Sequence, residues 1–375
     1  MRDAGHACGV TVSRSAPGAL QRLLTPFVNP GTLDFWAQHL RSNWSWDRPL
    51  ATVEARHVEA RDTVTLTLRP NRLVAWPKAG QHVNISVEVN GRRTTRSYSP
   101  TRIDRQAGTF DITVKHIPQG AMSTHLCHAV HVGGLVEVGE VFGHMTWPAT
   151  PAGKWLLLAA GSGITPMISL LRQAQAAGSQ ADVVLIYAAR QRADLCFLAE
   201  LNQLAQREPG FKLQLVLSRE TELLNTEVGG RINADLIQSQ VGDLAERQVL
   251  ACGPAGFVDT ARALTAHAAR RFDAEAFTPP VLAAAADDAA APVRVVLQQS
   301  GRTVTVNSGE PLLPALEAHG LQVPFGCRMG VCNTCSCAKV SGTTRNMQSG
   351  ELDAEPDSAV RLCIASARSD LTLDL

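Results

Sequence analysis

The sequence lacks an excess of charge of either sign. Of its 375 residues, 35 are Lys or Arg and 34 are Asp or Glu, so the formal net charge is +1. This balance argues against a nucleic-acid binder that depends on bulk positive charge. Aromatic residues are also scarce, at 5%, although 45% of the residues are hydrophobic, which predicts packed cores rather than wholesale disorder.

Uninterrupted apolar segments are also missing. The first twenty residues contain Arg2, Asp3 and Arg14 and no continuous apolar core, so we expect no signal peptide. The uncharged run 155–171 is broken by glycines and a proline, which predicts a buried strand entering a helix and no transmembrane segment. We therefore expect a cytoplasmic protein.

The cysteines are unevenly spread along the chain. Four of the nine fall between Cys327 and Cys337, and Cys363 follows near the end. A secreted disulfide scaffold would be shorter and would space its cysteines more evenly. One dense cluster in a long chain indicates a metal site in a reducing compartment.

Changes of pattern divide the chain into domains. Residues 52–150 carry short alternating runs, and Asn90-Gly91 is a favoured two-residue hairpin turn, so we expect an antiparallel β-barrel. Residues 151–272 alternate continuous apolar strands with helical patterns, which predicts a parallel sheet covered on both faces. Residues 293–375 form a small separate unit that a bound cluster would help to fold.

Two further segments connect or precede these domains. Residues 273–292 are rich in alanine and proline and show no strand pattern, so we interpret them as an interdomain linker, partly helical at 283–291. Residues 1–51 form an apolar extension. It either packs on the barrel or offers a contact surface to a protein or membrane-bound partner.

The spacing of the clustered cysteines identifies the kind of metal site. Cys327 is followed by four residues and Cys332, then by two residues and Cys335, then by 27 residues and Cys363. This is the plant-type [2Fe-2S] spacing, in which four thiolates surround two irons. A structural zinc site is the alternative, although such a site usually takes its ligands from two closely spaced pairs of residues. The loop at 324–340 resembles the cluster loop of plant-type ferredoxins, and this resemblance implies a β-grasp fold for 293–375.

A flavin site is indicated within the expected barrel. Arg96 could neutralise a phosphate, and the ring of Tyr98, next to Ser99, could lie against an isoalloxazine. A second motif follows at a point where a helix could begin, and its amides could hold a pyrophosphate. Its candidate residues are Gly120, Met122 and Ser123.

Two motifs in the α/β region indicate a dinucleotide site. After the apolar strand at 155–160, small residues would let the backbone approach a pyrophosphate, and a proline would suit the first helical turn. The candidates are Gly161, Gly163, Thr165 and Pro166. The second motif, Cys252-Gly253-Pro254, ends a later strand at the sheet edge where ligands bind, so Cys252 could pack beside a nicotinamide.

Taken together, these motifs resemble the ferredoxin–NADP reductase family across residues 52–272. The family pattern R-x-Y-S matches Arg96, Tyr98 and Ser99, and its other three patterns match the motifs above. The resemblance implies FAD as the flavin, with Tyr98, Ser99 and Cys252 as the residues closest to hydride transfer. It also implies that Ser218-Arg219, assisted by Arg190, holds the 2′-phosphate of NADPH; NADH is the less favoured donor, because no acidic residue ends the second strand.

The whole chain resembles the reductase component of an oxygenase or desaturase system, most closely the reductases of fatty-acyl desaturases. The expected activity is NAD(P)H-dependent oxidoreduction through FAD and a [2Fe-2S] cluster to a terminal oxygenase or desaturase, which could be membrane-bound. A Rieske oxygenase or a cytochrome P450 is the alternative acceptor. A cluster-based redox sensor and a zinc-stabilised flavoenzyme are alternative activities. We expect a monomer whose linker lets the ferredoxin unit swing between flavin and partner.

Overall fold

The computed structural model describes residues 43–277, 291–326, 328, 330 and 332–375. They form two compact units, one up to residue 277 and the other from residue 291. The predictions made for residues 1–42, for residues 278–290 of the linker and for Cys327 lie outside the described residues.

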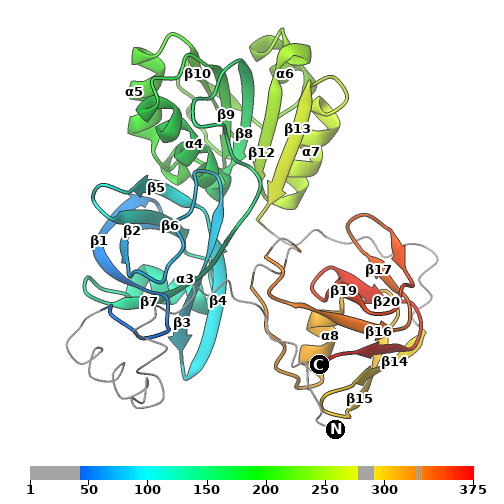
Figure 1. Cartoon of the computed structure of the whole chain (residues 1–375). Helices are drawn as coiled ribbons and strands as arrows, with labels where there is room; N and C mark the ends of the chain where they lie inside the picture. Colours follow the sequence, from blue (N-terminus) through cyan, green and yellow to red (C-terminus); the bar gives the residue numbers. More distant parts are fainter. Residues whose placement is uncertain (1–42, 278–290, 327, 329, 331) are drawn as a thin grey trace. The chain divides into compact units, whose positions relative to one another are not determined.

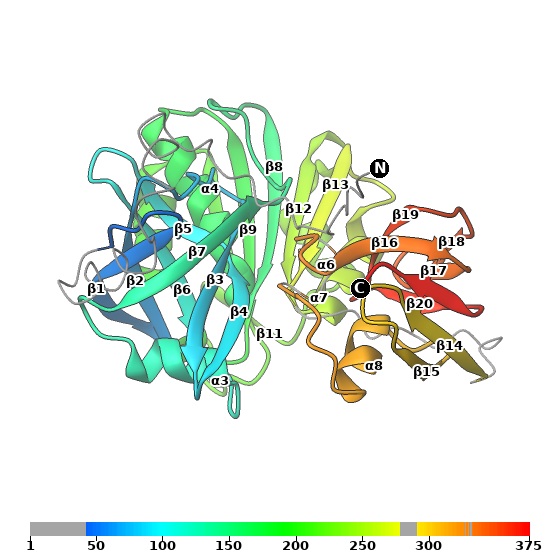
Figure 2. The same ribbon diagram turned by 60° about the horizontal axis from the view of Figure 1, so that its bottom comes forward.

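The first unit begins with a half-barrel of antiparallel strands in the order β4-β3-β7-β1-β2-β6-β5 (Figures 1 and 2). Asn90 and Gly91 have φ values of 53° and 72° and close the predicted hairpin between β3 and β4. The strands are β1 (Leu50–Ala60), β2 (Thr63–Pro70), β3 (His82–Val89), β4 (Arg92–Tyr98), β5 (Pro100–Asp104), β6 (Thr109–Lys115) and β7 (Leu135–Phe142).

The first residue of the barrel domain differs slightly from the prediction. Strand β1 starts at Leu50, because Leu50 and Ala51 are buried and pair with β7, so the expected boundary at residue 52 is two residues late. The preceding residues also contact the barrel, since the Asn71 side chain donates to the carbonyls of Asn43 and Arg48. The described end of the N-terminal extension therefore packs on the barrel.

A parallel sheet in the order β11-β10-β9-β8-β12-β13 forms the rest of this unit (Figure 1). Alternate residues of β8 enter different cores: Leu157 packs under α4 and α5, whereas Leu156 packs under α6 and α7. Its elements are β8 (Lys154–Ala160), α4 (Ile164–Ala176), β9 (Asp182–Ala189), α5 (Leu198–Arg207), β10 (Phe211–Leu217), β11 (Glu227–Gly229), α6 (Ala234–Gln240), β12 (Gln248–Gly253), α7 (Ala255–Thr265) and β13 (Arg271–Ala276).

Strand β13 corrects the predicted linker. Residues 273–276 pair in parallel with residues 250–253 of β12, so they belong to the sheet and not to a linker that begins at residue 273. The free edge of β12 supplies hydrogen-bond partners to this alanine-containing segment, which carries too few large apolar residues to be recognised as a strand. At the other end, Pro292 already begins β14.

The second unit has the predicted β-grasp arrangement of strands around helix α8 (Leu312–Ala318) (Figures 1 and 2). A mixed sheet has the order β15-β14-β21-β16-β19, and a small sheet has the order β18-β17-β20. The strands are β14 (Pro292–Leu297), β15 (Thr303–Asn307), β16 (Ser336–Ser341), β17 (Thr344–Asn346), β18 (Leu352–Asp353), β19 (Ser358–Arg361), β20 (Ala365–Ala367) and β21 (Leu371–Leu373). Among the described helices of both units, none is long and apolar enough to cross a membrane.

Candidate functional site

The predicted flavin residues lie at the end of strand β4. Arg96 is exposed and Tyr98 is half-buried, and burial against the barrel core raises the pKa of the Tyr98 phenol. Ser99 is 3% exposed, and its Oγ has no hydrogen-bond partner within the described part of the chain. A buried hydroxyl without a partner is costly, so this position fits a bound polar group such as the edge of a flavin.

The second flavin motif forms the turn into helix α3 (Ala121–Thr124), which continues as a π-helical turn over His125–Ala129. The Ser123 Oγ accepts a hydrogen bond from the Ile117 N–H and donates one to the Gly120 carbonyl, both at 3.1 Å. A Cβ at Gly120 would lie 2.7 Å from the Ser123 Oγ and 3.0 Å from the Ile117 carbonyl oxygen, so this turn favours glycine. Met122 is buried in the barrel core, which leaves only its backbone available to a cofactor.

The dinucleotide loop turns sharply between β8 and α4. Gly161 has a φ of 54°, and the Thr165 hydroxyl donates to the Ser162 carbonyl at 3.0 Å. A Cβ at Gly163 would lie 2.0 Å from the carbonyl oxygen of Cys252. The loop therefore packs directly on the end of β12, and its small residues leave room for a pyrophosphate to approach the backbone.

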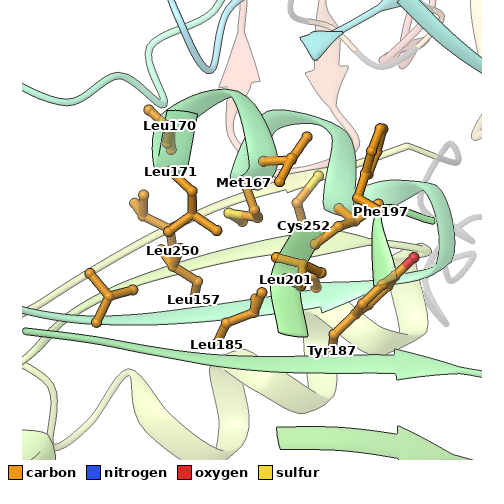
Figure 3. Packing of buried hydrophobic residues seen from close by; sticks show 14 of the residues in the cluster. Leu157, Met167, Leu170, Leu171, Leu185, Tyr187, Phe197, Leu201, Leu250 and Cys252 are labelled. Carbon is orange, nitrogen blue, oxygen red and sulfur yellow. The ribbon is translucent and has the colours of Figure 1, made fainter. Parts of the chain in front are cut away.

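The side chain of Cys252 lies beneath helix α4, among Met167 and Leu250 (Figure 3). It is fully buried, and burial raises the pKa of its thiol well above the ordinary value. The thiol is therefore neutral and inert as a nucleophile. Gly253 ends β12 and Pro254 precedes α7, which places the motif at the carboxyl edge of the sheet as predicted.

The barrel meets the carboxyl edge of the sheet at a small recess. Its barrel side is lined by Thr63, Thr113 and Lys115, and its other side includes Gly161 and Ser162 of the dinucleotide loop. A nucleotide held on the loop would therefore lie next to the flavin domain. Sequence reasoning did not find Lys115, because an isolated lysine at a strand end carries no signal of its own.

The residues predicted to hold a 2′-phosphate lie together at the ends of β9 and β10. Arg190, Ser218 and Arg219 are exposed, and the Arg219 N–H donates to the Arg190 carbonyl at 2.8 Å. Neither arginine forms an ion pair with any other described residue. Two unpaired guanidinium groups at one sheet edge form a site that suits a phosphate.

A buried acid and histidine also lie near this edge, and sequence reasoning missed both. Glu275 on β13 is the strand neighbour of Cys252, and its Oε2 lies 3.3 Å from Nε2 of His82 on β3. Burial raises the pKa of Glu275 to about 7 and lowers the pKa of His82 to about 4. The pair joins the barrel to the sheet, and no sequence signal could have found it because its members lie 193 positions apart.

Three of the four predicted cluster ligands are described, and all three are buried: Cys332, Cys335 and Cys363. The hydrogen bond with the Cys363 sulfur lowers the pKa of Cys335, so these two sulfurs are neighbours despite their separation in sequence. No group of three or more described His, Cys, Asp or Glu side chains is arranged around one metal ion. A [2Fe-2S] cluster does not need such a group, because each of its irons takes two protein thiolates.

The loop before these cysteines is held by its neighbours. Gly330 has a φ of 75°, and a Cβ there would lie 2.4 Å from the Ile364 side chain, which follows Cys363. The Arg361 guanidinium donates to the Gly330 carbonyl. These contacts of Gly330 bring the two cysteine-bearing segments together.

Comparison with known proteins agrees with this arrangement. An oxidoreductase FAD-binding domain matches residues 51–147, an oxidoreductase NAD-binding domain matches 157–263, and a 2Fe-2S iron-sulfur cluster binding domain matches 295–368. The [2Fe-2S] interpretation thus holds over the zinc alternative, and the two nucleotide domains exclude a sensor that consists of the cluster alone.

Two curated proteins are similar over nearly the whole chain. The NADPH oxidoreductase of Mycobacterium tuberculosis is 33% identical over 95% of this chain and 92% of its own length. The glycine betaine monooxygenase reductase subunit of Pseudomonas aeruginosa is 28% identical over 93% and 99%. The crystal structure of phthalate dioxygenase reductase has a TM-score of 0.58 at 24% identity, over 87% and 97% of the two chains, and shows the shared fold.

The half-barrel, the parallel sheet and the cysteine-bearing β-grasp unit therefore occur in the same order as in these relatives. The chain belongs to the family of NAD(P)H-dependent oxidoreductases that combine an FAD-binding domain with a C-terminal [2Fe-2S] ferredoxin domain.

Proposed function

We propose that this protein is the reductase component of an oxygenase system, with NADPH as electron donor and a terminal oxygenase as acceptor. The observation that supports the proposal is the recess where barrel residues meet the Gly161 loop, because there the predicted dinucleotide loop faces the domain that carries the flavin motifs. Bound FAD can accept a hydride from the nicotinamide and release electrons singly to the cluster. The protein binds, orients and shields these groups.

The flavin is proposed to be held by β4 and by the turn into α3. The Ser99 hydroxyl supplies a hydrogen bond to its ring edge, since Ser99 Oγ lacks a partner within the described residues. Tyr98 covers the ring, and Arg96 at the exposed end of the strand binds phosphate. Met122 and Ser123 present backbone N–H groups to the pyrophosphate, and Gly120, whose own N–H donates to the Ile117 carbonyl, shapes the turn.

The dinucleotide is proposed to lie on the loop from Gly161 to Pro166, with Thr165 fixing the loop. Cys252 is proposed to lie beside the nicotinamide through its backbone, because its side chain is fully buried among apolar residues. Gly253 and Pro254 form the adjoining wall.

The preference for NADPH rests on Arg190, Ser218 and Arg219. A 2′-phosphate would form ion pairs with the two unpaired guanidinium groups. The relative from Mycobacterium tuberculosis is named an NADPH oxidoreductase. Arg219→Ala should lower kcat/KM for NADPH by about 10- to 100-fold, the worth of a charge-assisted hydrogen bond, and leave that for NADH within threefold. An equal loss with both nucleotides would contradict the assignment.

The fourth cluster ligand is proposed to be Cys327, beside Cys332, Cys335 and Cys363. The proposed acceptor is an oxygenase because the Pseudomonas relative is named as the reductase subunit of a monooxygenase. None of the three relatives described above is named as a desaturase reductase. We propose that the protein acts as a monomer in the cytoplasm and reaches a membrane only through its partner.

The proposal is tested with the full-length protein. Its visible spectrum should contain flavin and iron–sulfur absorption that anaerobic NADPH bleaches, and it should drive NADPH-dependent turnover of a purified terminal oxygenase. Cys363→Ser should keep NADPH-dependent reduction of ferricyanide and lose oxygenase turnover. A colourless zinc protein would refute the electron-transfer function. Turnover with a vesicle-bound fatty-acyl desaturase and with no oxygenase would refute the proposed acceptor.

A further inference from the structure

Tyr187 is one of two tyrosines in the chain and lies near the carboxyl end of strand β9. It is fully buried, with its ring among the apolar residues under α4 and α5 and its hydroxyl oxygen at one end of that cluster (Figure 3). The hydroxyl donates to the Gly161 carbonyl at 3.2 Å and accepts a hydrogen bond from the Cys196 N–H at 3.1 Å. The phenol therefore joins two loops at the carboxyl edge of the sheet.

The first of these loops is the dinucleotide loop. The Gly161 carbonyl also accepts a hydrogen bond from the Ile164 N–H, the first residue of α4. On its other side, the loop packs on the end of β12 through Gly163. The Tyr187 hydroxyl is thus the side-chain contact that fixes the orientation of the Gly161 peptide, with which the loop begins.

The second loop, residues 191–197, is tied to the barrel. The Arg61 guanidinium lies 2.8 Å from Asp194, and the Arg61 N–H donates to the Ala193 carbonyl at 2.9 Å. The Phe197 N–H donates to the Glu59 carboxylate at 2.9 Å. Through this loop, the Tyr187 hydroxyl connects the dinucleotide loop to the domain that carries the flavin residues.

A phenylalanine would fill the same space, so packing alone does not explain the hydroxyl. A buried hydroxyl is tolerated when it is hydrogen-bonded, and this one uses both its donor and its acceptor. Burial raises the pKa of Tyr187 well above its ordinary value, so the group stays protonated and can donate.

We propose that Tyr187 is a positioning residue for nicotinamide dinucleotide binding: its hydroxyl fixes the Gly161 carbonyl and couples the dinucleotide loop to the barrel through residues 191–197. This inference rests on the proposed function, because it assigns the loop to NADPH. Hydride transfer demands close control of the distance between donor and acceptor, and a link between the two domains supplies that control.

The test compares Tyr187→Phe with Thr265→Val in the full-length protein. Thr265 is a matched control, because its buried hydroxyl, at the end of α7 in the same domain, donates to the Ala261 carbonyl at 2.8 Å. Loss of the phenol hydroxyl leaves the Cys196 N–H unpaired. We expect kcat/KM for NADPH with ferricyanide to fall by about 5- to 30-fold, mainly through KM, while Thr265→Val stays within twofold of wild type.

A double-mutant cycle with Asp194→Asn tests the coupling. If Tyr187 acts through the 191–197 loop, Asp194→Asn alone should also raise KM, and the losses of the two variants should not add. Additive losses, an unchanged KM in Tyr187→Phe, or an equal loss in Thr265→Val would each overturn the inference. Failure of the proposed function would look different, because wild-type protein would then not reduce ferricyanide with NADPH.

Discussion

The buried pair of His82 and Glu275 predicts two variants whose stabilities change with pH in opposite directions. The His82 side chain is 4% exposed and that of Glu275 is 16% exposed, so solvent screens neither group strongly. His82 also stacks on Phe142, with ring centroids 5.4 Å apart, and meets Phe277 edge to face at 5.9 Å. This apolar surrounding disfavours the charged form of both groups.

The size of the effect follows from the two pKa values. Burial lowers the pKa of His82 from 6.5 to about 4 and raises the pKa of Glu275 from 4.5 to about 7. At about 1.4 kcal/mol for each pH unit, each difference corresponds to about 3 kcal/mol over its full range, and to about 2 kcal/mol between pH 5 and pH 8.

The signs are opposite. The stability linked to Glu275 is fully present below pH 4.5, where the carboxyl is protonated in both states, and is lost as the pH rises through 7. The stability linked to His82 is present above pH 6.5 and is lost as the pH falls through 4. In the wild-type protein the two contributions nearly cancel over this interval, so only the single variants reveal them.

Relative to wild type, Glu275→Gln should gain about 2 kcal/mol of unfolding free energy between pH 5 and pH 8, and His82→Phe should lose about 2 kcal/mol. Urea unfolding followed by the fluorescence of the buried Trp147 and Trp155 measures both. Two variant curves that run parallel to wild type, or that shift in the same direction, would refute the reasoning.

Two further predictions concern the nucleotide loop and the cluster. Gly163→Ala should reduce NADPH-dependent ferricyanide reduction at least tenfold, because the new Cβ would lie 2.0 Å from the backbone of β12. Gly256→Ala is the control and should leave the rate unchanged, because a Cβ there meets nothing within 4 Å. Equal rates for the two variants would count against the close packing of Gly163. In visible spectra of the purified proteins, Cys335→Ser should remove the iron–sulfur absorption. Cys337→Ser should retain it, because Cys337 does not fit the ligand spacing. Loss of the absorption in Cys337→Ser alone would reverse the ligand assignment.

The features of this protein that depend on local patterns could be predicted from its sequence. The hairpin at Asn90-Gly91 was predicted because asparagine and glycine adopt the required positive φ values more readily than other residues. The order of a β-barrel, a parallel sheet and a β-grasp unit followed from a change in hydrophobic period and from the cysteine spacing. Glycine loops and cysteine spacings involve residues that are close in sequence, so they can be recognised without knowledge of the fold.

Tertiary structure alone decided what depends on distant residues. The alanine-containing residues 273–276 form a strand because the edge of β12 is free to pair with them, a fact that no local pattern contains. The same edge places Glu275 against His82, and the fold brings the Tyr187 hydroxyl to Gly161 and Cys196. Burial shifts the pKa values of Glu275 and His82, and it makes an unpaired Tyr187 hydroxyl costly. Both effects arise only once the chain has folded.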